Sequence, residues 1–152
     1  MTDPRWLDDR EQRAWRGYLA MQGRLQAHLN RRLQADSGLS LADFEVLVAL
    51  TDVPEGRVRV RELAEAVQWE KSRLSHHLAR MERRGLIERQ DCDDDARGAF
   101  VALTPEGRRA IEQAAPPHVE TVRSAMFDGL DADEVETLAH IAEVVLGRIG
   151  TQ

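Results

Sequence analysis

The chain has little cysteine, few aromatic residues and no long apolar run. Cys92 is the one cysteine, which excludes an internal disulfide framework and fits a reducing cytoplasm. No stretch approaches the roughly 20 apolar residues that cross a bilayer, and the N-terminal MTDPRWLDDR lacks the pattern of a signal peptide. With 42% hydrophobic and 32% charged residues among 152, we expect one folded cytoplasmic domain spanning 1–152.

Sequence motifs of common enzymes and metal sites are also missing. The chain contains no G-x-S-x-G, no Walker loop, no H-E-x-x-H and no Cys/His cluster at zinc spacing. Acid pairs such as Asp133-Glu134 fall at a predicted helix start, where capping explains them. We therefore expect no enzymatic activity, no cofactor and no metal.

Charge is distributed unevenly along the chain, although the net charge is −6. Residues 57–89 contain nine Lys or Arg and five Asp or Glu, a local net charge of +4. Residues 110–152 contain two Arg and eight acids, a local net charge of −6. A basic middle beside an acidic C-terminal segment indicates that the middle faces an anion.

Apolar periodicity predicts long helices at both ends of the chain. Residues 8–35 carry Leu25, Leu29 and Leu33 at helical spacing, and Ser40 is a predicted N-cap for the next helix. Thr104-Pro105 starts another helix, which we expect Pro116-Pro117 to break or kink. Asp131 and Glu134 resemble a capping box for a final helix with an apolar face.

The middle of the chain predicts two short helices followed by a β-hairpin. The first helix carries Leu63, Ala64 and Val67; the second carries Leu74, Leu78 and Met81 and ends at Gly85. Residues 86–90 and 99–103 are predicted strands around the turn DCDDDARG. Residues 57–60 alternate Arg and Val and form a further candidate strand. This order is typical of a winged helix-turn-helix.

The outer face of the second helix favours nucleic acid as its partner. Ser72, His76, Arg80 and Arg83 lie opposite the apolar face, with Arg73 and Ser75 at its flanks. Such side chains donate hydrogen bonds to base edges and phosphates. Lys71 and Ser72 lie in the first turn, where the helix dipole favours a phosphate. A solvated helix surface of mixed charge is the alternative for this helix taken alone.

The segments LSLADFEVLVAL, RELAEAVQWEKSRLSHHLARMERRGLIER and DDDARGAFVALTPEGRRAI resemble the MarR family of bacterial transcription regulators. The wing signature of that family matches here in residue type and spacing, over Asp95, Arg97, Val101, Leu103, Thr104 and Gly107. The resemblance implies a mainly α winged helix-turn-helix with a small β-hairpin, the wing. It divides the chain into dimerisation helices at 8–36 and 104–150 and a DNA-binding lobe at 40–103.

The resemblance also implies a role for each side chain on the basic face and the wing. Arg97 is expected in the minor groove, where negative potential is concentrated, and Asp95 is expected to orient it. Trp15 is a candidate effector contact, because effectors of the family bind between the dimerisation helices and the DNA-binding lobe. Packing is the alternative for Trp15, and Trp69 is expected to pack the turn between the two short helices. The expected DNA-binding residues are Lys71, Ser72, Arg73, Ser75, His76, Arg80, Arg84 and Arg97.

The acidic turn has two other possible roles, and its residues favour neither. Asp91, Asp93 and Asp95 mimic a calcium loop, but Ala96 and Ala102 replace its required glycine and glutamate. Cys92 could sense oxidants, yet the surrounding acids disfavour its thiolate, so we expect an inert exposed thiol.

The sequence therefore predicts a transcriptional regulator, a repressor by default. It would bind a pseudo-palindromic operator as a homodimer and be released by a small aromatic or anionic effector. The alternative is a winged helix that binds a protein and not DNA.

Overall fold

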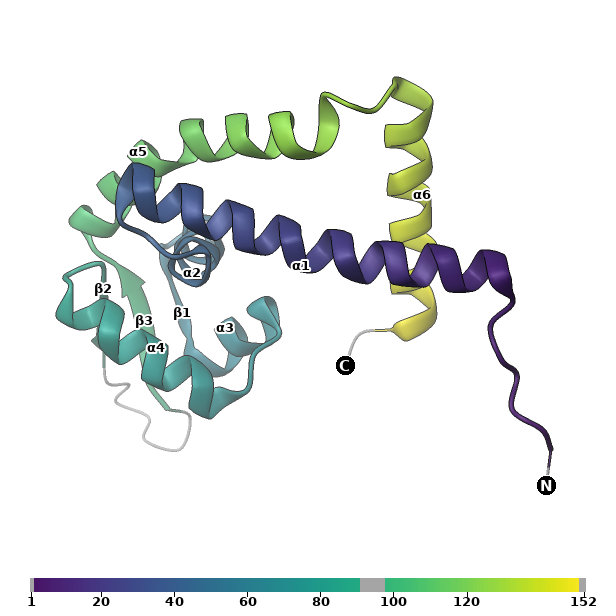
Figure 1. Ribbon diagram of the computed structural model, residues 1–152. Helices are drawn as coiled ribbons and strands as arrows, with labels where there is room; N and C mark the ends of the chain where they lie inside the picture. The colour runs from purple at the N-terminus through teal and green to yellow at the C-terminus, as the bar shows by residue number, and fades with distance from the viewer. Residues whose placement is uncertain (1, 91–97, 151–152) are drawn as a thin grey trace.

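The computed structural model describes residues 2–90 and 98–150. The elements in chain order are α1 (Asp9–Ser37), α2 (Leu41–Thr51), β1 (Arg57–Arg59), α3 (Val60–Val67), α4 (Lys71–Arg83), β2 (Ile87–Gln90), β3 (Phe100–Leu103), α5 (Pro105–Val122), the π-helix η2 (Arg123–Phe127) and α6 (Ala132–Ile149). Figure 1 shows α1 and α5 side by side, with the lobe α2–β3 beneath one end of the pair and α6 at the other end.

The helix starts follow the capping residues of the sequence. Ser40 caps α2 and Asp131 caps α6, each within a complete capping box. Thr104 caps α5 by accepting a hydrogen bond from the backbone N–H of Gly107 at 2.9 Å, with Pro105 at the first helical position. Gly38 ends α1 in the left-handed conformation at φ 75°. All of these boundaries were predicted within one or two residues.

The predicted break at Pro116-Pro117 is wrong. Helix α5 continues through both prolines to Val122 and passes directly into η2. Both prolines are exposed, so the carbonyl groups that lose an N–H partner can be solvated. Ala114 and Thr121 on either side of the prolines are buried, and this packing keeps the segment helical.

The sheet has three antiparallel strands in the order β1-β3-β2. The predicted hairpin β2–β3 is present, with Arg89 opposite Val101. Strand β1 adds to the free edge of β3, with Val58 also opposite Val101. The sequence predicted this segment as a candidate strand but not its pairing, because the partner lies more than 40 residues along the chain.

One hydrophobic core fills the lobe and its junction with the long helices. Leu47, Leu50, Leu74, Leu78 and Met81 are fully buried in it, as the helical spacing predicted for the last three. Leu33 of α1 and Ile111 and Ala114 of α5 join the same cluster. The lobe is therefore attached to the α1/α5 pair by shared apolar packing.

Candidate nucleic-acid interface

Helices α3 and α4 are the two helices of a helix-turn-helix. The connection is Gln68 to Glu70, and Gln68 takes a left-handed conformation at φ 60° that turns the chain sharply. Trp69 is half-buried and packs against the core, with its backbone N–H donating to the carbonyl of Ala64 at 3.1 Å. The predicted packing role of Trp69 is confirmed, and the turn fixes the start of α4.

Helix α4 has one apolar face and one polar face. Leu74, Leu78 and Met81 have no exposed surface, and His77 is the one polar residue of α4 that is buried beside them. The predicted DNA contacts on this helix are exposed, apart from the partly buried Ser75: Lys71, Ser72, Arg73, His76 and Arg80. The structure thus brings these side chains onto one continuous surface.

The first turn of α4 is arranged to accept an anion. Its N-cap is Glu70, whose side chain makes no capping hydrogen bond, and the first turn contains no acidic residue. Lys71 and Ser72 lie there and are exposed. Free backbone N–H groups, a lysine and a hydroxyl together suit a phosphate oxygen.

Arg73 is held against an aromatic ring. Its guanidinium lies 4.4 Å from the centre of the Trp69 ring, a cation–π contact. Burial raises the pKa of Glu45, and the charge of nearby Arg73 opposes that rise. The stacking leaves the edges of the guanidinium, which carry its donors, outside the ring contact.

A buried acid, Asp43, anchors α4 from below. It is 3% exposed and lies on α2, where it also completes the capping box with Ser40. Its Oδ2 accepts from Arg84 Nη1 at 2.8 Å, and its Oδ1 lies 2.9 Å from His77 Nε2. Burial by itself raises the pKa of the Asp43 carboxyl, but the contacts with His77, Ser40 and Arg84 outweigh burial and hold this pKa well below its usual range.

Arg84 has a contact that the sequence did not reveal. Besides its ion pair with Asp43, its Nη2 donates to the carbonyl of Gly38 at 3.0 Å. The guanidinium therefore joins the end of α4 to the α1–α2 corner. Its predicted phosphate contact stays a prediction. Sequence reasoning also missed Asp43, since an acid three residues after an N-cap serine signals only a capping box.

The tip of the wing lies outside the described residues. The predicted contacts Arg97 and Asp95, and Cys92 with the acidic turn, all fall there. The base of the wing is described: the guanidinium groups of Arg57 and Arg59 lie 4.1 and 4.7 Å from the centre of the Phe100 ring.

These two arginines were not among the predicted site residues. Their alternation with Val58 was the available signal, because it places both on one face of β1. Together they place two positive charges at the Phe100 ring of β3. Within residues 2–90 and 98–150, no group of three or more His, Cys, Asp or Glu could hold a metal ion.

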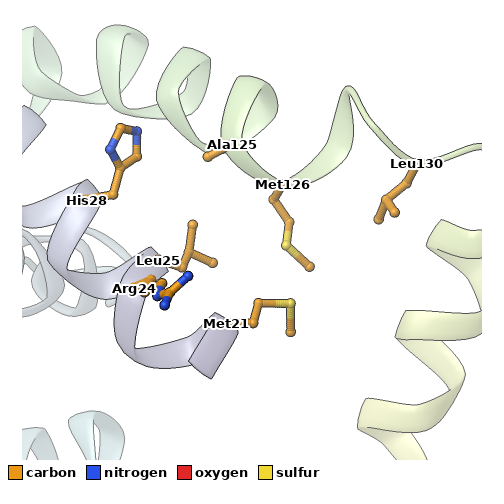
Figure 2. A pocket seen from close by; sticks show the side chains of 7 residues that line it. All are labelled: Met21, Arg24, Leu25, His28, Ala125, Met126 and Leu130. Carbon is orange, nitrogen blue, oxygen red and sulfur yellow. The ribbon is translucent and has the colours of Figure 1, made fainter. Parts of the chain in front are cut away.

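A cavity lies away from this surface, between α1 and the segment after α5. Its volume is about 370 Å³, and Figure 2 shows Met21, Leu25 and Met126 pointing into it. Arg24 and His28 add polar groups to a mostly apolar lining. Trp15 does not line this cavity; it is exposed on α1 and stacks on Tyr18 with ring centres 5.9 Å apart.

Comparison with known proteins identifies this arrangement. Residues 37–98, which contain the helix-turn-helix and the first wing strand, β2, match the model of the MarR family. The solved structure of Sco3205, a MarR family transcriptional regulator from Streptomyces coelicolor in complex with DNA, is 41% identical. It superposes with a TM-score of 0.89 over 95% of this chain and 91% of its own. The chain belongs to the MarR family.

Curated relatives support the same membership. The transcriptional regulator HosA of Escherichia coli is 33% identical over 121 residues, which are 80% of this chain and 87% of HosA. The transcriptional repressor YetL of Bacillus subtilis is 28% identical over 107 residues, which are 70% of this chain and 64% of YetL. The winged helix-turn-helix fold of this MarR family chain is thereby confirmed. Among its described helices, none is both long and apolar enough to span a membrane.

Proposed function

We propose that this MarR family chain is a DNA-binding transcriptional regulator of the repressor type. The observation that carries the proposal is α4 itself. Its apolar face is fully buried, and its exposed face presents hydroxyl, imidazole and guanidinium groups. The sheet that forms the wing also carries a positive charge, that of Arg57 at the Phe100 ring. Sco3205, which shares the fold, is described in complex with DNA. Catalysis has no place in this proposal, and the protein would act in the cytoplasm.

Direct reading of the major groove is assigned to the outer face of α4. Guanidinium groups bind guanine through two parallel hydrogen bonds, and Ser and His donate to several base edges. Lys71 at the free N-terminus of α4 and Arg84 at its end are proposed to contact phosphates. Arg97, held by Asp95, is proposed for the minor groove. The groove-facing residues are Ser72, Arg73, Ser75, His76 and Arg80.

The active form is proposed to be a homodimer. Residues 8–36 and 104–150 would supply the dimerisation helices, and residues 40–103 the DNA-binding lobe. Support comes from the exposed apolar side chains of α6, where Ile141, Leu146 and Ile149 are 53%, 66% and 61% exposed. A two-fold axis would place the two recognition helices in successive major grooves of a pseudo-palindromic site, about one helical turn apart.

The cavity between α1 and η2 is the proposed place to look for an effector. Methionine and leucine side chains suit an aromatic ring, and Arg24 suits an anionic group. In the proposed dimer, the DNA-binding lobes of the two subunits can lie at different distances from each other. A ligand that binds one of these arrangements more tightly than another would change the affinity for DNA.

The test is fluorescence anisotropy of the purified protein with DNA from its own upstream region and with random DNA, at several salt concentrations. We expect binding to the upstream DNA that is at least ~10³-fold tighter and that weakens steeply with salt. Equal and weak binding to several upstream and neighbouring promoters and to random DNA would favour the alternative, a winged helix that binds a protein.

A further inference from the structure

A chain of polar contacts runs from the buried Asp43 to the exposed Arg80. Asp43 Oδ1 lies 2.9 Å from Nε2 of His77, and Nδ1 of the same ring lies 3.0 Å from Nη2 of Arg80. We propose that His77 is a positioning residue for DNA recognition: it holds the Arg80 guanidinium on the outer face of α4, and Asp43 sets the imidazole tautomer that can do so. This inference rests on the proposed function of α4 as the recognition helix.

The direction of the hydrogen bond follows from the chemistry of the two groups. A guanidinium has donors and no acceptor, so Nδ1 of His77 must accept from Arg80. A neutral imidazole that accepts at Nδ1 carries its proton at Nε2, which is the nitrogen beside the Asp43 carboxylate. The Nε2 contact is short but not aligned as a linear hydrogen bond, so its contribution is mainly electrostatic. The negative charge of Asp43 still favours a proton at Nε2.

The imidazole cannot easily turn its other nitrogen to Arg80. His77 is 8% exposed, and its ring meets the Trp69 ring edge-on, with centres 5.4 Å apart and planes at 87°. Trp69 in turn carries Arg73 on its ring. Arg73 and Arg80, both predicted to contact DNA, are therefore each held by one ring of the Trp69–His77 pair. Holding a long side chain in its binding conformation lowers the entropy lost when it binds.

The anchor of the contact chain is fixed to the rest of the protein. Asp43 accepts from the backbone N–H of Ser40 at 2.9 Å and from Arg84, which also binds the carbonyl of Gly38 at the end of α1. These contacts connect the position of Arg80 to the α1–α2 corner, so it does not depend on α4 alone.

A double-mutant cycle on the full chain tests this role. The variants are His77→Phe, Arg80→Ala and both together, measured by anisotropy on the preferred DNA and on random DNA. Phenylalanine keeps the ring beneath Trp69 and removes both nitrogens. We expect His77→Phe to weaken specific binding about tenfold and random binding little. In the Arg80→Ala background the same substitution should change specific binding less than twofold.

Arg83 provides the matched control, because it is exposed on the same helix and is not the residue that His77 binds. In the Arg83→Ala background His77→Phe should retain its full tenfold effect. An equal effect of His77→Phe in all three backgrounds, or none in any, would overturn the positioning role while leaving DNA binding established. Absence of specific DNA binding by the wild type would overturn both proposals. If His77→Phe does not fold by circular dichroism, His77→Asn, whose amide oxygen can accept from Arg80, enters the cycle with an expected smaller loss.

Discussion

The apolar side chains of the lobe are buried, whereas those of helix α6 are exposed. In the lobe, Leu47, Leu50, Leu74 and Leu78 have no exposed surface and belong to one buried cluster. Helix α6 has no buried residue, although its sequence has a clear apolar face. The same periodic pattern therefore marks a core in one region and an uncovered surface in the other.

The difference shows which region can fold by its own contacts. The lobe shares its core with Leu33 of α1 and Ala114 of α5, so it is complete within one chain. Trp15, Tyr18 and Leu19 near the start of α1 are about half exposed, like the apolar residues of α6. Exposed apolar patches of this kind mark sites of association. This contrast supports the proposal that the lobe provides stability and the ends of the chain provide assembly.

The largest effect is expected from placing charge on the apolar face of α6. Ile141→Glu with Val145→Glu puts two carboxylates on one helix face, where a partner subunit would have to bury them. We expect the dimer to dissociate to monomers and affinity for the preferred DNA to fall more than ~100-fold, because two half-sites are no longer bound together. Light scattering and anisotropy measure the two effects.

His140→Glu is the control for that double variant, since it also adds a carboxylate to α6 but on another face of the helix. It should remain dimeric. A monomer from His140→Glu, or a dimer from the double variant, would show that the apolar face of α6 is not the contact.

The next effect compares two glycines in helices. A Cβ on Gly107 would overlap the main-chain carbonyl oxygen of Leu86, whereas a Cβ on Gly17 of α1 would meet nothing within 4 Å. We expect Gly107→Ala to reduce the free energy of unfolding by about 3 kcal/mol, because backbone cannot move aside cheaply. Gly17→Ala should increase it by about 0.5–1 kcal/mol through the higher helix propensity of alanine.

Urea unfolding monitored by circular dichroism measures both glycine variants. A tolerated Gly107→Ala would mean that α5 and the lobe are not packed as described. A loss of stability at Gly17 would instead indicate that a partner subunit approaches α1 there.

The third effect concerns Asp43 and pH. Its pKa in the folded protein lies below the usual value, so its stabilising contribution is complete at neutral pH and is lost as the pH falls below about 4, the pKa of an aspartate in an unfolded chain. Asp43→Asn should cost about 2 kcal/mol at pH 7, a magnitude typical of hydrogen bonds to a charged group. The variant should also lose less stability than the wild type between pH 5 and 3.

Asp36→Asn provides the control for Asp43, because Asp36 makes only an exposed pair with Arg32 at 3.7 Å on α1. Its unfolding free energy at pH 7 should stay close to that of the wild type. Parallel pH curves for the wild type and Asp43→Asn would refute the assigned role of the buried carboxylate.

The smallest effect is expected at the wing. Arg97→Ala should lower the slope of log affinity against log salt by about 1 and weaken binding at A·T-rich positions under the wing. Anisotropy at four salt concentrations measures the slope, and Arg31→Ala on α1 is the control outside the lobe. An unchanged slope would remove the wing arginine from the interface.

Local signals predicted most of the helix and strand boundaries. Ser40, Thr104, Asp131 and Gly38 each act through hydrogen bonds or φ angles within a few residues, so their effect is readable from the chain itself. Pro116-Pro117 is the exception, because buried neighbours hold α5 together against the local preference.

Part of the site was also predictable. The buried Leu74 and the exposed Ser72 and His76 follow from helical spacing alone, which decides which face is polar. The contact of Arg84 with Asp43 was not predictable, because the two residues are 41 positions apart and either could equally have faced solvent.

The sequence by itself determined the elements, their caps, the polar face of α4 and the family, since these depend on spacing and on local chemistry. Only the tertiary structure decided that β1 pairs with β3, that His77 lies between Asp43 and Arg80, and that α6 is left uncovered within one chain. These last features depend on which distant surfaces meet, and side-chain packing settles that only once the whole chain is folded.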